Sequence, residues 1–154
     1  GVLLQGAPNC GKSELALALL DRGHILIADD AVTLSRHNNT LTAVPTEPHN
    51  QKIYLRSIGT ITPQHFFTHQ ATQPQSHVNL LIQLTHATNV LPQYHLNPNA
   101  MSTFLSVKIP SWTLYLPSPI DLALKVETIV KKYKMDFNPY LDKTHTQANE
   151  ETHA

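Results

Sequence analysis

The sequence predicts an α/β fold, in which a mixed β-sheet is flanked by helices, from three features of its first half. A short apolar run at residues 1–5 ends at a glycine turn, and a strongly apolar helix pattern follows over residues 13–22. A second apolar run, residues 25–28, comes directly after that helix. A polar turn at residues 37–39 then separates two strand patterns, as in an antiparallel hairpin. Strands on both sides of a helix, followed by a hairpin, favour a mixed sheet.

The helix over residues 13–22 is expected to lie against the sheet rather than on the surface. Its residues 15–20 are all leucine or alanine, so it is apolar nearly all round, which is typical of a buried helix. Gly23 follows and marks the end of the helix. The hairpin after it is predicted to consist of strands at residues 32–35 and 40–44.

The second half of the chain predicts further strands and one amphipathic helix. Residues 78–84 form a strand candidate, and residues 104–109 and 113–116 are expected to be two more strands, separated by Pro110. A final helix is predicted over about residues 120–133. One face of this helix is apolar and carries Leu122, Val126, Ile129 and Tyr133.

The length and composition predict one compact domain over residues 1–137 and a polar, flexible tail over residues 138–154. A chain of 154 residues with 41% hydrophobic content is long enough to bury a real core. Two polar segments, residues 45–51 and 68–77, are expected to be mobile loops. The first strand begins at residue 1, so we expect further residues upstream in the natural protein.

Charge and composition argue against several classes of partner. Eleven basic and eleven acidic side chains cancel, so the chain has no electrostatic footprint for nucleic acid or an anionic membrane. No apolar run approaches the roughly 20 residues that cross a bilayer, and a single cysteine forms no internal disulfide. We therefore expect a cytoplasmic protein, with any anion site confined to a local feature of the chain.

That local feature is a P-loop between the first strand and the first helix. The motif consists of Gly6, Ala7, Pro8, Asn9, Cys10, Gly11, Lys12 and Ser13. Its glycines permit tight turns and close approach, and the helix that follows points its unpaired N–H groups at an anion. We expect Lys12 to reach the β and γ phosphates of a nucleotide and Ser13 to bind its magnesium ion. The alternative is a turn that binds nothing, but the preceding strand and following helix favour the nucleotide site.

Two adjacent carboxylates, Asp29 and Asp30, follow the second apolar run. At the carboxyl end of a strand they would lie where open α/β sheets bind their ligands. Beside a P-loop, one of them would order magnesium or accept the proton of an attacking hydroxyl. The alternative is that the pair only caps a turn.

These residues carry a resemblance to a known family. Gly-Lys-Ser-Glu at 11–14, Arg-Gly-His at 22–24 and Ile-Ala-Asp-Asp at 27–30 resemble the catalytic domain of bacterial HPr kinase/phosphorylase. Residues 56–61 resemble an Arg-Gly-Leu-Gly-Ile segment of that family, and weaker similarity extends to about residue 130.

The resemblance implies a P-loop kinase core and a bifunctional enzyme. Such an enzyme phosphorylates a serine of the phosphocarrier HPr with ATP and removes that phosphate by phosphorolysis, in regulation of carbohydrate metabolism. Carried over by motif, Lys12 and Ser13 would contact the nucleotide and its magnesium, and Asp29 would act as the base, or as the acid in the reverse reaction. The family also forms oligomers, so the resemblance implies a homo-oligomer as one alternative for this chain.

The chain departs from the family at two functional positions. Tyr54 stands where the family has a magnesium-binding glutamate, and a phenol is a poor magnesium ligand. Ile120 stands where the family has an arginine that faces the transferring phosphate. Two alternatives to an active protein kinase therefore stay open: a catalytically degenerate module that binds nucleotide, and a small-molecule kinase on the same scaffold.

Overall fold

The computed structural model describes residues 1–86, 96–118 and 121–137. The chain divides into two compact units, Gly1–Ser118 and Pro119–Ala154. All strands in the described part of the chain, and the first two helices, belong to the first unit. The described part of the second unit contains the helix α3 (Leu122–Asp136), and the predicted tail over residues 138–154 lies outside the described residues.

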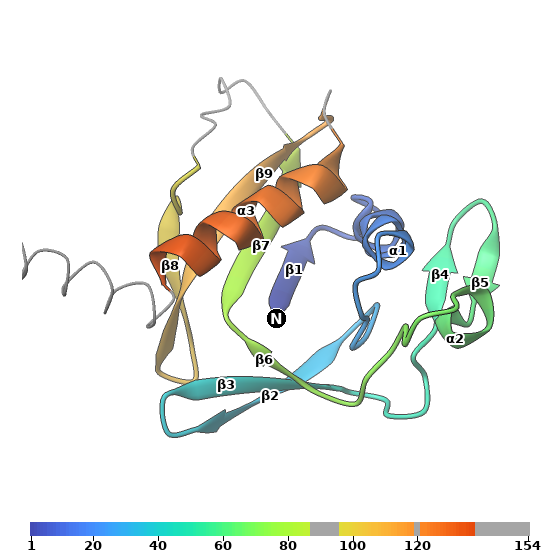
Figure 1. Cartoon of the computed structure of the whole chain (residues 1–154), viewed down its shortest axis with the longest axis horizontal. Coiled ribbons are helices and arrows are strands. Elements are labelled where there is room, and N and C mark those ends of the chain that lie inside the picture. The colour runs from blue at the N-terminus through green and yellow to red at the C-terminus, as the bar shows by residue number, and fades with distance from the viewer. Residues whose placement is uncertain (87–95, 119–120, 138–154) are drawn as a thin grey trace, which may run out of the picture. The chain divides into compact units, whose positions relative to one another are not determined.

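The centre of the first unit is a four-stranded mixed sheet, as the sequence predicts (Figure 1). Its strands lie in the order β1 (Val2–Gly6), β7 (Leu80–His86), β9 (Val107–Leu116) and β8 (Ala100–Phe104). The pairs β1–β7 and β7–β9 are parallel, whereas β8 and β9 are antiparallel. In β7 the residues Leu80, Leu81 and Ile82 are all buried, which is typical of a parallel strand inside a sheet.

The predicted hairpin forms, but in a sheet of its own. It consists of β2 (Val32–His37) and β3 (Thr40–Pro45), and β6 (Ser76–Val78) adds a third strand beside β3. Asn38, at the turn, adopts a left-handed φ of 53°, a conformation that asparagine tolerates well. A further small hairpin, β4 (Ile53–Leu55) and β5 (Gly59–Ile61), precedes the short helix α2 (Pro63–Phe66).

The helix α1 (Lys12–Asp21) begins directly at the P-loop and ends one residue before the predicted limit. Gly23 has φ 94°, and its N–H donates to the carbonyl of Leu20 at 2.9 Å. The N–H of His24 donates to the carbonyl of Leu19 at 3.0 Å. These two bonds form a Schellman motif, which explains why a glycine follows the helix at this point.

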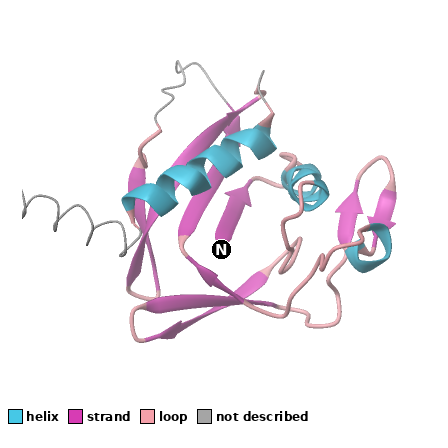
Figure 2. Cartoon of the chain, in the orientation of Figure 1, coloured by secondary structure: helices cyan, strands magenta, loops and turns pink. Residues whose placement is uncertain are grey.

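The predicted strand at residues 25–28 is wrong, because only Leu26 pairs, in an isolated parallel bridge with Thr72. The N–H of Leu26 donates to Ala71, and the N–H of Gln73 donates to Leu26. Pro74 follows and has no N–H to donate, and residues 27–31 continue without regular structure. Figure 2 accordingly draws the connection between α1 and β2 as loop. Asp29 and Asp30 therefore do not lie at the end of a sheet strand.

The two strands predicted on either side of Pro110 are also wrong, because β9 runs unbroken through that proline. Pro110 lies opposite Met101 of β8, and pairing with β7 begins only at Ser111. The missing N–H of Pro110 therefore costs no bond to β7. The true break is the two-residue turn between β8 and β9, where Leu105 and Ser106 have φ 48° and 65°.

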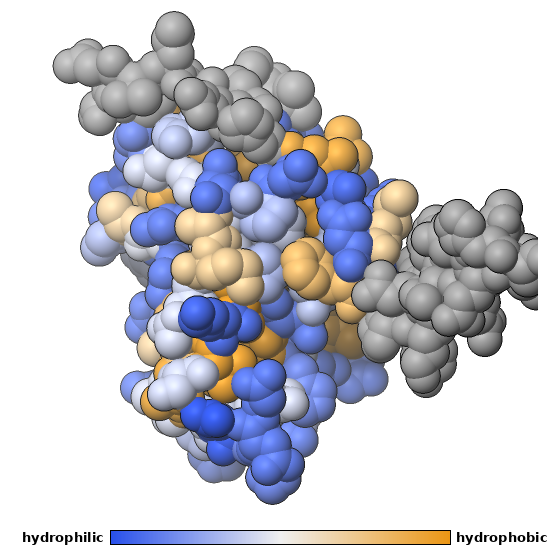
Figure 3. Space-filling view, turned by 90° about the vertical axis from the view of Figure 1, so that its left-hand side faces the viewer, coloured by the Kyte–Doolittle hydropathy of each residue, from blue (hydrophilic) through white to orange (hydrophobic). Residues whose placement is uncertain are grey.

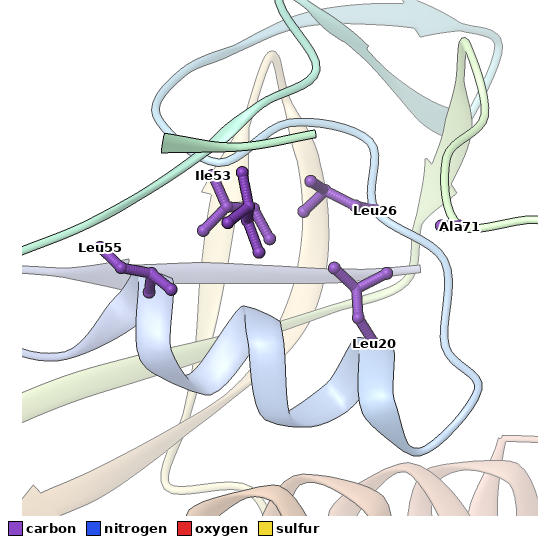
Figure 4. Packing of buried hydrophobic residues seen from close by; sticks show 6 residues of the cluster. Leu20, Leu26, Ile53, Leu55 and Ala71 are labelled. Carbon is purple, nitrogen blue, oxygen red and sulfur yellow. The ribbon is translucent and has the colours of Figure 1, made fainter. Parts of the chain in front are cut away.

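Two clusters of buried side chains hold the first unit together. One lies between the sheets and contains Leu41, Ala43, Val78, Leu81, Val107 and Ile109. The other packs α1 against the β4–β5 hairpin and contains Leu20, Leu26, Ile53, Leu55, Ile61 and Ala71. Figure 4 shows the side chains of Leu20, Leu26 and Ile53 turned toward one another. This second cluster matters for function, because it fixes the helix that follows the P-loop against the segment that carries Asp29.

The helix α3 begins at the N-cap Asp121, whose side chain accepts a hydrogen bond from the N–H of Ala123 at 2.9 Å. Ile120, singled out from the sequence, lies outside the described residues. Across residues 1–86, 96–118 and 121–137, no helix has the length and apolarity needed to cross a membrane. On the face shown in Figure 3, hydrophilic side chains surround smaller hydrophobic areas.

Candidate functional site

The predicted P-loop connects the carboxyl end of β1 to the first turn of α1. Asn9 and Gly11 both have left-handed φ angles, 60° and 101°. Backbone of this kind turns neighbouring N–H groups toward the inside of a loop, as in anion-binding nests. Gly11 is the N-cap of α1 and brings no side-chain acceptor to the first-turn N–H groups. The positive end of the helix dipole therefore faces the loop, ready for an anionic ligand.

The first glycine of the loop is required by packing against Cys10. A Cβ added to Gly6 would lie 2.6 Å from the Cys10 sulfur and 3.0 Å from the carbonyl oxygen of Leu84. The Cys10 side chain is buried and occupies the space that a larger residue at position 6 would need. Cys10 thus supports the base of the loop, whereas the predicted loop residues Ala7, Pro8 and Asn9 are exposed.

Lys12 folds back over the loop. Its Nζ donates hydrogen bonds to the carbonyl oxygens of Gly6 at 2.7 Å and Ala7 at 3.2 Å. The side chain is half-buried, so its positive charge is held at the loop rather than extended into water. An ammonium group has three donors, and phosphate oxygens are acceptors that match it.

Asp29 meets the P-loop through Ser13, although the two residues are sixteen positions apart. The hydroxyl of Ser13 donates to Oδ1 of Asp29 at 2.9 Å. The other carboxylate oxygen, Oδ2, accepts from the backbone N–H of Tyr54 at 3.1 Å. Asp29 is half-buried, whereas Asp30 is exposed. The two neighbouring carboxylates therefore differ: Asp29 is hydrogen-bonded to the P-loop, whereas among the described residues Asp30 has no such bond.

The oxygen atoms at this site suit a magnesium ion. Magnesium prefers oxygen ligands and is usually held by one or two protein groups together with phosphate oxygens. The Ser13 hydroxyl and the Asp29 carboxylate, hydrogen-bonded at 2.9 Å, are such a pair. They come from α1 and from the segment before β2, so the ion would be held between the two.

The sequence did not reveal the groups that hold Asp29 in place. The N–H of Tyr54 contributes through its backbone, so no side-chain pattern could have indicated it. Gln51, expected to belong to a mobile loop, instead donates from Nε2 to the carbonyl oxygens of Ile27 at 2.9 Å and Gln73 at 2.7 Å. A half-buried glutamine in a polar segment gives no signal of this role in the sequence.

Two further positions that the family resemblance singled out, Tyr54 and Arg56, lie in β4 and in the turn after it. Arg56 is exposed in the turn between β4 and β5. The side chain of Tyr54 is 63% exposed, while its backbone is bonded to Asp29. Position 54, where the family resemblance places a glutamate, is therefore in contact with the candidate site.

A family model and curated relatives of this chain all belong to one family of proteins. Residues 1–149 match the family described as HPr serine kinase C-terminal domain. HPr kinase/phosphorylase of Neisseria meningitidis serogroup C is 33% identical over 168 residues, which cover 99% of this chain and 52% of that protein. The enzyme of the same name from Streptococcus thermophilus is 32% identical over 136 residues, which cover 87% of this chain and 44% of the relative. The chain spans about half the length of these curated relatives.

A solved structure supports the same assignment. The structure of the Hpr(Ser) kinase/phosphatase from Coxiella burnetii aligns with a TM-score of 0.83 at 33% sequence identity. The alignment covers 95% of this chain and 90% of that one. The mixed sheet and the helices that follow the P-loop are thus the fold of this family. The chain belongs to the HPr serine kinase C-terminal domain family.

Proposed function

We propose that this chain binds Mg-ATP at its P-loop and transfers the γ-phosphoryl group to a serine of a phosphocarrier protein of the HPr type. The observation that carries the proposal is the hydrogen bond from Ser13 to Asp29 at 2.9 Å. It brings a carboxylate next to Ser13, in the first turn of the helix that follows the P-loop. A nucleotide phosphate and an acceptor hydroxyl can therefore meet next to one acid–base group.

Each residue of the site has a distinct role in this proposal. The loop from Gly6 to Gly11 surrounds the β-phosphate with backbone N–H groups. Lys12 exchanges its bonds to the loop carbonyls for bonds to the β and γ phosphates. Ser13 and Asp29 are the residues that would hold magnesium, which neutralises charge that develops on the phosphate oxygens.

In the forward direction, Asp29 accepts the proton of the acceptor serine hydroxyl. The serine oxygen then forms a bond to the γ-phosphorus, and the bond from that phosphorus to the β–γ bridging oxygen breaks, which releases ADP. A carboxylate has about four lone-pair sites, of which the bonds from Ser13 and Tyr54 occupy two and magnesium would occupy a third. Asp29 can therefore be held by its neighbours and still accept a proton.

In phosphorolysis of the phosphoserine, the protonated Asp29 acts as the acid. An oxygen of inorganic phosphate attacks the phosphorus of phosphoserine, and the proton of Asp29 passes to the departing serine oxygen. The products are serine and pyrophosphate, so the same carboxylate acts as a base in the kinase reaction and as an acid in phosphorolysis. Asp30 is exposed next to it and supports the negative potential that attracts magnesium.

A second candidate function, nucleotide binding without transfer, is favoured by Tyr54. The backbone N–H of this residue donates to Asp29, so position 54 borders the site. A phenol there supplies no carboxylate to a metal ion. A module of this kind would signal nucleotide occupancy to a partner instead of phosphorylating it.

The experiment that separates these functions uses the protein in its natural length, incubated with Mg-ATP and an HPr phosphocarrier. Saturating nucleotide, at about 100 times its dissociation constant, stabilises the fold by about 2.7 kcal/mol if it binds only the folded state. Stabilisation together with labelled phosphate on a serine of HPr supports the kinase. Stabilisation without transfer supports the binding module, and transfer to a small metabolite alone assigns a different acceptor. The absence of stabilisation contradicts every nucleotide-based function.

A further inference from the structure

We infer that Gln51 is a positioning residue for Asp29, an inference that rests on the acid–base role proposed for that carboxylate. The hydrogen bonds of the Gln51 side chain go to Ile27 and Gln73, and not to Asp29 or the P-loop. It acts on the backbone two residues before Asp29, at Ile27. The stretch from Gln51 to Tyr54 therefore fastens the Asp29 segment twice, through a side chain at Ile27 and through a backbone N–H at Asp29.

The need for such a residue follows from the irregular backbone around Asp29. A carboxylate at the end of a sheet strand would be held by the ladder bonds of its neighbours. Here the ladder stops after the single bridge between Leu26 and Thr72, and backbone pairing resumes only at Ala31, whose carbonyl oxygen accepts from the N–H of Thr46. Without another constraint, the direction of the chain entering Asp29 would not be fixed.

Gln51 takes the place of the next step in that ladder. If the parallel ladder continued, the N–H of Ala28 would donate to the carbonyl oxygen of Gln73. That oxygen instead accepts from Gln51 Nε2 at 2.7 Å, and the same nitrogen donates to the carbonyl oxygen of Ile27 at 2.9 Å. The side-chain amide thus bridges two segments at the position where their backbones stop pairing.

The chemistry of the bridge requires a neutral amide. A glutamine nitrogen has two N–H donors, and the two carbonyl oxygens use both of them. A glutamate at the same position has no donor and would bring a negative charge against two carbonyl dipoles. A methionine of similar length would fill the space but leave both half-buried carbonyl oxygens without this partner.

The segment at residues 71–73, which carries the second acceptor of the bridge, is also firmly held. Ala71 and Thr72 are buried, and Thr72 Oγ1 accepts from Gln64 Nε2 at 2.6 Å. The segment at residues 71–73 is therefore a fixed base, and Gln51 transmits its position to the chain that leads into Asp29.

The test compares Gln51→Glu and Gln51→Met with the wild-type protein, and uses Gln75→Glu as the matched control. Gln75 is exposed in the loop between α2 and β6, so its substitution introduces the same charge without removing a donor of the bridge. We measure phosphate transfer from Mg-ATP to HPr and, independently of activity, the hydrogen exchange of the Tyr54 amide by NMR. A displaced Asp29 lowers kcat by about 10- to 100-fold, because misplacement of about 1 Å has effects of this size. KM for ATP stays nearly constant, since the P-loop is intact.

The exchange measurement keeps this inference separate from the proposed function. In both Gln51 variants the Tyr54 amide should exchange at least about tenfold faster than in wild type, because its acceptor Asp29 is no longer held in place. Gln75→Glu should leave both kcat and exchange unchanged. If wild type transfers no phosphate, the proposed function fails while the exchange result still decides the positioning role. A lower melting temperature with unchanged Tyr54 exchange and unchanged kcat in the folded variants would overturn it.

Discussion

The hydroxyl of Ser13 donates to Oδ1 of Asp29 at 2.9 Å, and this bond joins the first turn of α1 to a segment that belongs to no sheet. The site is therefore made of two parts of the chain, which are held in place in different ways. The P-loop is held by β1, by α1 and by Cys10 beneath Gly6. Asp29 is held by single hydrogen bonds, which makes its geometry the more sensitive of the two to substitution.

Lys12→Ala should weaken nucleotide binding without unfolding the chain. The ammonium group donates to the loop carbonyls in this structure and would donate to phosphate oxygens in the complex. Hydrogen bonds to charged groups contribute about 1.5–3 kcal/mol, so the affinity for Mg-ATP should fall by about 10- to 100-fold. Isothermal titration calorimetry measures this change. Lys108→Ala, at an exposed lysine of β9, is the control and should bind as wild type does.

Gly6→Ala should destabilise the fold and impair nucleotide binding, because the new Cβ meets the Cys10 sulfur at 2.6 Å. Overpacking of this kind costs about 1–3 kcal/mol, which urea unfolding resolves. In the double variant with Cys10→Ala the sulfur is gone, but the contact with the Leu84 carbonyl remains at 3.0 Å. A double-mutant cycle should therefore show partial relief, and strictly additive effects would contradict the packing described here.

Tyr54→Glu should lower the magnesium concentration needed for half-maximal phosphate transfer. The residue is 63% exposed, and its bond to Asp29 uses the backbone, so the substitution should leave the fold intact. A carboxylate here adds an oxygen ligand that magnesium prefers to a phenol. Tyr54→Gln is the control of equal length without the charge. Identical magnesium dependence in the two variants would show that position 54 does not reach the metal.

The local features of the fold were predictable, because neighbouring residues determine them. The strand, the P-loop and the helix at its start follow from apolar runs and glycines within about twenty residues, and Gly23 ends α1 as expected. The mixed sheet was also predicted correctly. The strand at residues 25–28 was not, since an apolar run of this length is equally compatible with a buried loop, and its only pairing, at Leu26, depends on a segment 46 positions away.

Within the site, side chains with characteristic chemistry were easier to foresee than the contacts that hold them. Lys12, Ser13 and Asp29 were singled out from the sequence, and the structure brings Ser13 and Asp29 together even though the strand thought to carry Asp29 does not form. The bond from the backbone N–H of Tyr54 could not be predicted, because every residue except proline has such a group. The role of the Gln51 amide could not be predicted either, because glutamines are common in polar loops.

The central claim, that Asp29 is the acid–base group of a phosphate-transfer site, is tested most directly by Asp29→Asn. Asparagine can still accept from Ser13 but cannot take a proton from the acceptor serine. At saturating Mg-ATP, transfer to HPr should fall by about 10²- to 10⁴-fold while stabilisation by nucleotide is retained. Asp21→Asn, at the exposed end of α1, is the control and should behave as wild type. Transfer by Asp29→Asn at the wild-type rate would contradict the account.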